Sequence, residues 1–256
     1  MKTVQDRFSL QNKIALVTGA SRGIGSETAI ELAQAGADII LSARNMDDLE
    51  AVKEKILKLG RKAVIIPADL LDSQQIISLG NRALEVFGKI DILINNAGIG
   101  ELEPFLTTSC DNWKRTIQVN LTAPFLLSQI IGVKMAEQKS GKIINISSQA
   151  GVVAFDEHTA YSASKAGLNM LTKSIASELG IYNVQCNAVA PTVILTDLGK
   201  KAWGNPEKGD PIKAKIPLKR FGEVYEVADL VLFLSSEASN LITGQTICID
   251  GGYTIV

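Results

Sequence analysis

The chain has 256 residues, of which 46% are hydrophobic and 21% are charged, and its formal net charge is −1 at pH 7. This composition is ordinary for a globular protein with a sizeable core, and the mixed charges argue against nucleic acid or an anionic membrane as a partner. The three cysteines are far apart, which predicts free thiols rather than disulfides or a metal site. The stretch MKTVQDRFSLQNK lacks an apolar signal core, and no apolar run reaches the ~18 residues of a membrane span. We therefore expect a cytoplasmic protein without a metal.

Short β-branched apolar runs alternate with helical patterns along the chain. The predicted strands are mostly apolar, as expected when both faces of a sheet are covered, and they span residues 13–18, 38–42, 63–66, 91–94, 142–146, 184–189 and 246–249. The predicted helices span residues 24–35, 47–59, 73–87 with Ser73 as N-cap, 111–135, 160–179 and 223–234. This alternation predicts an α/β fold, a seven-stranded parallel, doubly wound sheet with helices on both faces.

No linker, repeat or change in composition interrupts this pattern, so we expect one domain over residues 1–256. The least regular segment spans residues 196–217 and is rich in glycine, proline and lysine. We expect this segment to be a mobile lid, within a substrate-loop region at about residues 192–217.

A glycine-rich turn, TGASRGIG at residues 18–25, lies between the first predicted strand and the first helix. Glycines allow a tight turn and a close approach of the backbone, so that free N–H groups and the helix dipole face a pyrophosphate. The spacing G-x-x-x-G-x-G differs from the commoner G-x-G-x-x-G, but the strand–turn–helix context agrees. The turn predicts a dinucleotide site of the Rossmann type, contacted by Gly19, Ser21, Arg22, Gly23, Ile24 and Gly25.

The end of the second strand decides between NAD and NADP. A carboxylate there would bind the 2′-hydroxyl of NAD, but the sequence reads LSAR at residues 41–44. Arg22 and Arg44 could flank a 2′-phosphate and Ser42 could hydrogen-bond it, which favours NADP over NAD. The alternative, that both arginines are ordinary solvated loop residues, stays open. Further cofactor contacts are expected after the third and fourth strands, with Asp69 facing the adenine amino group, and at Leu70, Asn96, Ala97 and Gly98.

Tyr161 and Lys165 are four residues apart on a predicted helix and therefore lie on one face. An ammonium beside a phenol favours the phenolate, which predicts a tyrosine pKa lowered from about 10 toward neutrality. Ser148 precedes Tyr161 by thirteen residues, and a turn could bring its hydroxyl alongside. Such a trio could donate a proton to a carbonyl oxygen or remove one from an alcohol. Taken alone, the pair also fits a surface tyrosine and lysine on an amphipathic helix.

In combination, these motifs resemble the short-chain dehydrogenase/reductase family over essentially the whole chain. The shared residues are T-G-x-x-x-G-x-G at 18–25, N-N-A-G at 95–98, Asn120, Ser148, Tyr161-x-x-x-Lys165 and Asp250-Gly251-Gly252. The resemblance implies that Tyr161 is the acid/base and that Ser148 hydrogen-bonds the substrate oxygen. It also implies that Lys165 holds the nicotinamide ribose and that Asn120 holds a water. Val193 and Thr196 would contact the nicotinamide carboxamide, with Pro191 beside them, and Ser147 would be a strand-end neighbour.

The C-terminal third is similar to the sugar-polyol branch of that family, which includes L-xylulose reductases and bacterial arabitol or threitol dehydrogenases. Pro191-Thr192 stands where most of the family shows Pro-Gly, and Ala202-Trp203 follows. This resemblance implies an NAD(P)(H)-dependent oxidoreductase that interconverts a polyol and its ketose. The candidate substrate contacts are Ser148, Gln149, Phe155, His158, Tyr161, Thr192 and Trp203.

Two other functions stay open from the sequence. One is reduction of a 3-oxoacyl thioester on an acyl-carrier protein, which a basic patch would favour. The other is a regulator that senses the cofactor without turnover, which has no need of a proton relay. The family resemblance also implies a homotetramer in which residues 111–135 and 160–179 pair between subunits and Tyr253–Val256 lies near another interface.

Overall fold

The strands are almost wholly apolar because each is covered on both faces. The computed structural model describes residues 2–196, 199–200 and 203–256. In these residues seven strands form one parallel sheet in the order β3-β2-β1-β4-β5-β6-β7. The strands are β1 Ile14–Thr18, β2 Asp38–Ser42, β3 Ala63–Ile65, β4 Ile92–Asn95, β5 Gly141–Ile146, β6 Val184–Pro191 and β7 Thr246–Ile249. The predicted fold class is confirmed.

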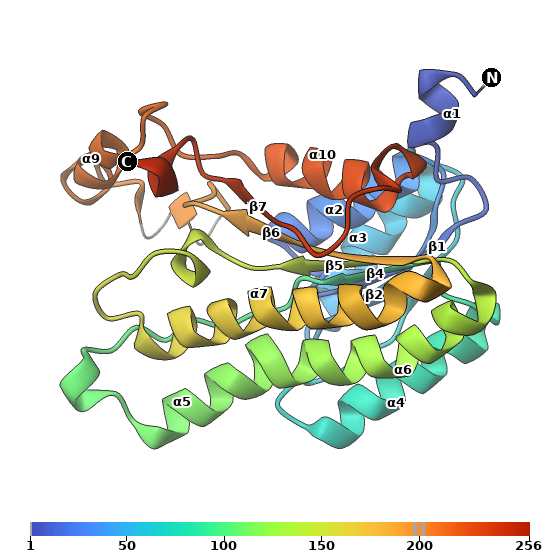
Figure 1. Cartoon of the computed structure of the whole chain (residues 1–256), viewed down its shortest axis with the longest axis horizontal. Helices are drawn as coiled ribbons and strands as arrows, with labels where there is room; N and C mark the ends of the chain where they lie inside the picture. Colours follow the sequence, from blue (N-terminus) through green and yellow to red (C-terminus); the bar gives the residue numbers. More distant parts are fainter. Residues whose placement is uncertain (1, 197–198, 201–202) are drawn as a thin grey trace.

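Helices cover both faces of the sheet (Figure 1). One layer holds α2 Gly23–Gln34, α3 Met46–Lys58 and α10 Val224–Ser235, and the other holds α4 Ser73–Phe87, α6 Ala123–Gln138 and α7 Thr159–Leu179. Successive side chains of a strand point to opposite faces. In β1, Ala15 and Val17 accordingly join the apolar core under the first layer, while Ile14 and Leu16 join the core under the second.

The helix predicted over residues 111–135 is interrupted at its centre. The structure has α5 Cys110–Ile117, a π-helical turn Gln118–Thr122, and then α6. Pro124 has no N–H, so the carbonyl of Asn120 lacks the donor that an α-helix would supply four residues later. Single π turns of this kind are frequent at functional sites. By length and hydropathy the run Cys110–Gln138 could cross a membrane, but half of its apolar window is buried inside the fold.

Part of the predicted lid is a regular helix. Pro206–Lys215 forms α9, and the side chain of Asn205 caps it by accepting from the backbone N–H of Glu207. The prediction of an irregular segment was wrong here, because a capping asparagine followed by proline is a helix-start signal. Residues 197–198 and 201–202 of the predicted lid lie outside the described residues. The cap of α4 is Asp72 rather than Ser73, since the Asp72 carboxylate accepts from the N–H of Gln74.

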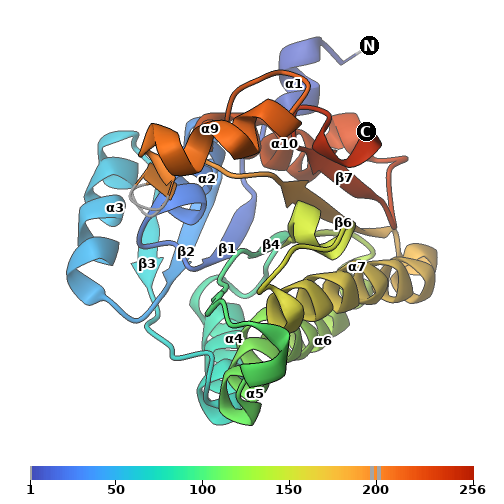
Figure 2. The same ribbon diagram turned by 90° about the vertical axis from the view of Figure 1, so that its left-hand side faces the viewer.

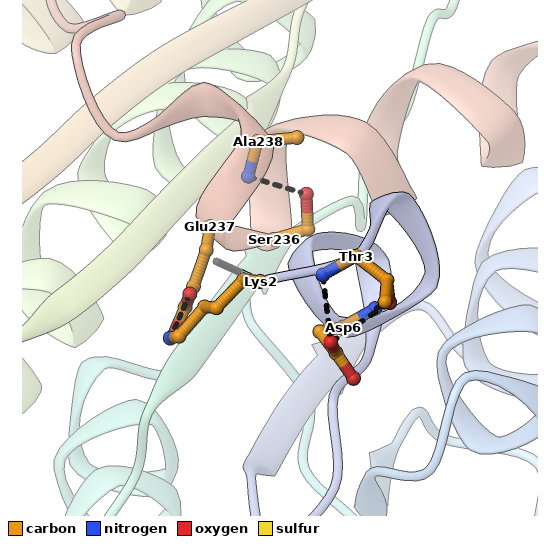
Figure 3. A network of polar contacts seen from close by, with 6 residues as sticks. All are labelled: Lys2, Thr3, Asp6, Ser236, Glu237 and Ala238. Atoms are coloured by element: carbon orange, nitrogen blue, oxygen red, sulfur yellow. Dashed lines mark hydrogen bonds and ion pairs between the residues drawn. The ribbon is translucent and has the colours of Figure 1, made fainter.

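A short helix near the N-terminus, α1 Val4–Phe8, was not predicted. Thr3 and Asp6 form a reciprocal capping box, in which each side chain accepts from the other's backbone N–H (Figure 3). Lys2 pairs with Glu237 of the 3-10 turn Glu237–Ser239, as Figure 3 shows. The Lys2–Glu237 pair links the N-terminal segment to the turn after α10, away from the cavity described next.

Candidate active site

A cavity of about 940 Å3 opens at the carboxyl ends of β1 to β4. In the sheet order, the chain leaves β1 toward β2 on one side while β4 lies on the other, and ligands of open α/β sheets bind at such a switch point. Most of the predicted cofactor residues line this cavity, namely Gly19, Ser21, Arg22, Gly23, Ile24, Gly25, Ser42, Arg44, Asp69, Leu70, Asn96, Ala97, Gly98 and Thr196.

The glycine turn is shaped for a close backbone approach. Gly19 and Gly23 have φ values of +64° and +58°, in the left-handed region that favours glycine. A Cβ at Gly25 would lie 2.3 Å from the carbonyl oxygen of Gly19, so no side chain fits there. Arg22 caps α2 without a side-chain hydrogen bond, which leaves N–H groups of the first turn for a ligand. These residues therefore fit a dinucleotide pyrophosphate.

Thr18 and Asn96 join the two strand ends beneath the turn. The Thr18 hydroxyl donates to the carbonyl of Ile94 at 3.2 Å and accepts from the N–H groups of Asn96 and Ala97 at 3.0 and 3.1 Å. The Asn96 amide donates to the carbonyls of Thr18 and Gly19 at 2.9 and 3.2 Å. The Asn96 side chain therefore holds the glycine turn in place, a role that its residue type alone did not reveal.

At the other end of the cavity, Ser42 is buried and Arg44 is exposed, and both line the wall. Asn45 and Asp48 line the same end and were missed by the sequence analysis. Asn45 caps α3 by accepting from the N–H of Asp48. This end of the cavity therefore combines a guanidinium and a hydroxyl with one carboxylate.

Tyr161 and Lys165 lie against the loop that closes the cavity after β4. A Cβ at Gly100 would lie 3.2 Å from Cδ2 of Tyr161, and one at Gly98 would lie 3.4 Å from Nζ of Lys165. The ammonium of Lys165 lies 5.6 Å from the centre of the Tyr161 ring and donates to the carbonyl of Ile146 at 2.7 Å. Both side chains come from α7, so the predicted shared helical face places them together.

Burial decides the protonation of this pair. It raises the pKa of Tyr161, and a hydrogen bond with Ser148 opposes that rise. The direction is opposite to the predicted one, because burial of the phenol away from water outweighs the Ser148 hydrogen bond. Burial also lowers the pKa of Lys165 to about 8. At pH 7 the site therefore holds a protonated phenol beside a lysine that is mostly charged.

Asn120 links α7 to the loop after β4 through hydrogen bonds of its side-chain amide. Its Oδ1 accepts from the N–H of Ile99 at 2.8 Å, and its Nδ2 donates to the carbonyl of Ile99 and to the hydroxyl of Ser164 at 2.8 and 3.0 Å. Ser164 in turn donates to the carbonyl of Tyr161 at 2.6 Å. These bonds occupy the Asn120 amide with groups of the protein itself, and the water that it was predicted to hold stays a prediction.

The sequence comparisons agree with this architecture. A family model described as enoyl-(acyl carrier protein) reductase matches residues 19–254. A solved short-chain type dehydrogenase/reductase from Mycobacterium marinum is 36% identical, covers 99% of this chain and 100% of its own, and superposes with a TM-score of 0.93. The chain belongs to the short-chain dehydrogenase/reductase family. It is thus an oxidoreductase of the NAD(P)-dependent type that the motifs predicted.

Curated members of the family cover nearly the whole chain. The NAD-dependent glycerol dehydrogenase of Listeria innocua is 42% identical over 97% of this chain and 96% of its own length. The D-threitol dehydrogenase of Mycolicibacterium smegmatis is 40% identical over 97% and 95%. A 3-oxoacyl-acyl-carrier-protein reductase of Aquifex aeolicus is 43% identical over 96% and 98%. Among solved structures, a gluconate 5-dehydrogenase from Burkholderia cenocepacia in complex with NADP and tartrate is 33% identical, with a TM-score of 0.94 and coverage of 99% and 100%.

Within this short-chain dehydrogenase/reductase, the predicted substrate residues occupy several places. Ser148 and Gln149 follow β5, and Ser148 accepts from the N–H of Ala150 at 3.1 Å. The ring of His158 lies 6.2 Å from that of Tyr161 in an edge-on arrangement and 5.5 Å from that of Phe155. Ser147 is buried and donates to the carbonyl of Lys165 at 3.3 Å, as expected for a strand-end neighbour.

Of the predicted contacts after β6, Thr196 and Trp203 line two different hollows. Thr196 lines the main cavity, where a Cβ at Gly23 would lie 3.0 Å from its Cγ2. The carbonyl of Val193 accepts from the N–H of Gly222 at 3.0 Å, and Pro191 ends β6. Trp203 instead lines a second hollow of about 620 Å3 together with Phe221 and Tyr225. Tyr161, Lys165, Pro191 and Val193 are not among the described residues that line the main cavity.

Several residues of the cavity wall had no recognisable sequence signal. Glu101 and Arg115 line it and form an ion pair, with 3.1 Å between Oε1 and Nη2. Glu101 lies in an irregular stretch and Arg115 on a helix, so only the fold brings them together. Ile99 and Val119 also line the cavity. Ile99 directly follows the predicted Gly98, and Val119 directly precedes the predicted Asn120. This adjacency in the sequence was the available signal for the two residues. Among the described residues, no group of three or more His, Cys, Asp or Glu could hold a metal.

Proposed function

We propose that this protein interconverts a four- to six-carbon polyol and its ketose with NADP(H). The observation that carries this proposal is a pair of buried side-chain oxygens, Oε1 of Gln149 and Oγ1 of Thr192, that have no hydrogen-bond partner within the described part of the chain. Gln149 follows β5 and Thr192 follows β6, and these adjacent strands end at the same edge of the sheet. Nine other buried side-chain atoms of the described residues also lack a partner, so the weight rests on the position of these two, at the strand edge that also carries Ser148, which suits a substrate rich in hydroxyl groups.

His158 adds a third polar group on the same side. Its Nδ1 lies 2.5 Å from the carbonyl oxygen of Asp156. A carbonyl only accepts, so Nδ1 carries a proton and Nε2 is left for another partner. Since the ring lies beside Tyr161, Nε2 suits a hydrogen bond with a substrate hydroxyl next to the reacting carbon.

The proposed mechanism divides hydride and proton transfer between cofactor and protein. The bound nicotinamide supplies or accepts the hydride. Tyr161 donates a proton to the ketone oxygen in reduction and removes it from the alcohol in oxidation. Ser148 hydrogen-bonds that oxygen, and the charge of Lys165 stabilises negative charge that develops on the phenol oxygen. The part of the cavity wall that lies between the Arg22 and Arg44 side chains would hold the cofactor.

A substrate panel with the purified protein tests the polyol assignment. Absorbance at 340 nm would follow glycerol, tetritols, pentitols, hexitols and their ketoses with NADP and with NAD. We expect the highest kcat/KM for a tetritol, pentitol or hexitol pair. The glycerol and D-threitol activities named for two relatives support this choice. Turnover of 3-oxoacyl thioesters without turnover of any polyol would overturn the proposal.

A 3-oxoacyl-thioester reductase is the second candidate. It is favoured by the Aquifex aeolicus relative of that name, whose identity of 43% equals or exceeds that of the polyol enzymes. An acyl chain needs apolar surface, however, and would leave the Gln149 and Thr192 oxygens unpaired.

A cofactor sensor without activity is the least favoured candidate, because the set of Ser148, Tyr161 and Lys165 has no purpose without proton transfer. No turnover of any substrate in the panel would favour it.

The pH dependence of turnover should differ between the two directions. Reduction needs the protonated phenol of Tyr161, whose pKa is raised, and the charged form of Lys165, whose pKa is about 8. Its kcat/KM should be level from pH 6 to 7 and fall above about 8, where Lys165 loses its proton. Oxidation needs the deprotonated phenol and should become faster as pH rises. Initial rates in both directions over pH 6–10 test this, and reduction that accelerates above pH 8 would contradict it.

We further propose that the protein is a cytoplasmic homotetramer. Trp113 on α5, Phe125 and Val133 on α6, and Met170 on α7 are exposed apolar side chains on helices of one layer. Pairing of these helices between subunits would cover them. A light-scattering mass of four times 27.4 kDa is the expected result, and a monomer would contradict it. Recovery in the soluble cytosolic fraction of its own cells tests the location.

A further inference from the structure

The C-terminal turn stacks an aromatic ring on the residues beside the catalytic tyrosine. Tyr253 lies in the 3-10 turn Tyr253–Ile255, and its ring is stacked on Phe155 with centroids 5.4 Å apart and planes inclined by 29°. Phe155 then contacts His158 at 5.5 Å, and His158 contacts Tyr161 at 6.2 Å. Four rings therefore form a continuous row from the end of the chain to the proposed proton donor.

The turn that carries Tyr253 is held from within. The Asp250 carboxylate accepts from the N–H groups of Gly252 and Thr254 at 2.9 and 2.8 Å and from the Thr254 hydroxyl at 2.7 Å. These three bonds fix the direction in which the Tyr253 ring leaves the backbone. Ile255, two residues later, is 82% exposed and takes no part in the row.

The same turn is packed tightly against the end of α9. The N–H of Leu218 donates to the carbonyl of Gly251 at 3.2 Å. A Cβ at Gly251 would lie 2.7 Å from Ile216, and one at Gly252 would lie 2.9 Å from Pro217. Both glycines have positive φ values, so the turn cannot easily change its shape. Figures 1 and 2 both place the C-terminus on the same side of the molecule as α9.

From these contacts we propose that Tyr253 is a positioning residue for substrate binding, which acts through Phe155 on the orientation of the His158 ring. His158 sits at the end of a loop, and within the described part of the chain its side chain has one hydrogen bond, to the carbonyl of Asp156, so the aromatic packing supplies the rest of the ring's restraint. If the stack is lost, Nε2 of His158 no longer keeps a fixed position relative to Tyr161. The substrate affected is one with a hydroxyl next to its carbonyl, and in this respect the inference rests on the proposed function.

A first measurement needs no substrate. His158 is the only histidine of the chain, so a tag-free sample gives a single set of imidazole signals by NMR. Tyr253→Leu should move the His158 ring signals, because the neighbouring Phe155 ring loses its stacking partner and shifts. Tyr253→Phe, which keeps the stack, should leave them in place, and so should Ile255→Ala. Unmoved His158 signals in Tyr253→Leu would overturn the proposal whatever the substrate is.

The second measurement is a comparison of KM and kcat in the same three variants. Tyr253→Leu should raise the KM for the polyol or ketose about two- to tenfold, the scale of one lost aromatic contact, with the cofactor KM and Tm unchanged. Tyr253→Phe should restore the wild-type KM. The KM for a simple ketone without hydroxyl groups should stay constant in every variant.

The outcomes separate this inference from the proposed function. Equal KM effects from Ile255→Ala and Tyr253→Leu would assign the effect to the turn as a whole and overturn the role of the Tyr253 ring. An equal rise in KM for the simple ketone would overturn the link through His158. If the wild type turns over no polyol, the proposed function fails, while the NMR comparison still decides whether Tyr253 positions His158.

Discussion

Replacing Tyr161 by phenylalanine should lower kcat by at least about a hundredfold, the usual scale of proton-transfer catalysis. The substitution removes one hydroxyl and leaves the ring against Gly100 and near His158, so the fold and the cofactor cavity should be unaffected. Cofactor affinity, measured by fluorescence titration, should change less than twofold. Steady-state rates with the best substrate of the panel, in both directions, are the measurement.

Tyr182→Phe is the matched control, because it makes the same chemical change in the 3-10 turn Gly180–Tyr182 after α7. That variant should keep the wild-type rate. A Tyr161→Phe enzyme with more than a tenth of wild-type turnover would show that another group transfers the proton. An equal fall of kcat in both variants would point to a change in the sample rather than to the chemistry of Tyr161.

Replacing Arg44 by alanine should lower kcat/KM for NADP about tenfold and leave kcat/KM for NAD almost unchanged. A hydrogen bond to a charged group contributes ~1.5–3 kcal/mol, and the exposure of Arg44 to solvent favours the lower end of that range. The effect should shrink at high salt, since it depends on attraction between a guanidinium and a 2′-phosphate. Parallel kinetics with both cofactors at low and high ionic strength test the assignment.

Arg82→Ala, at an exposed position on α4, is the control for a general loss of positive charge. The wall near Arg44 also contains Asp48, whose carboxylate opposes a 2′-phosphate. The glycerol dehydrogenase relative is NAD-dependent, whereas the gluconate 5-dehydrogenase structure contains NADP, so family membership leaves the choice open. A wild-type preference for NAD, or an equal loss with both cofactors in Arg44→Ala, would refute the NADP assignment.

Local patterns predicted much of this protein. Apolar runs separated by amphipathic helices predicted the parallel sheet, and the glycine turn predicted a cavity at its edge. The interval between Tyr161 and Lys165 predicted a shared helical face, and the Lys165 ammonium lies 5.6 Å from the centre of the Tyr161 ring. Two local signals were read incorrectly. Asn205 followed by Pro206 indicated α9, and Pro124 indicated an interruption in the long helix.

Other features had no local signal, because they depend on which surfaces meet. Glu101 and Arg115 form an ion pair across a loop and a helix. Tyr253 and Phe155 meet only because β7 lies at one edge of the sheet and the loop after β5 reaches toward it. Asp48 lies in the first turn of α3 and lines the cavity beside Arg44.

Hydrophobic period and turn chemistry act over a few residues, and the sequence alone therefore determines the fold class and the order of the elements. The same local signals determine the positions of the glycine turn and of Tyr161 and Lys165. The direction of the Tyr161 pKa does not follow from them. Charge spacing along a helix predicted a lowered value, but the assembled fold removes water from the phenol, and desolvation is a property of the whole surroundings. For the same reason the unpaired oxygens of Gln149 and Thr192 became visible only once the strands beside them were placed.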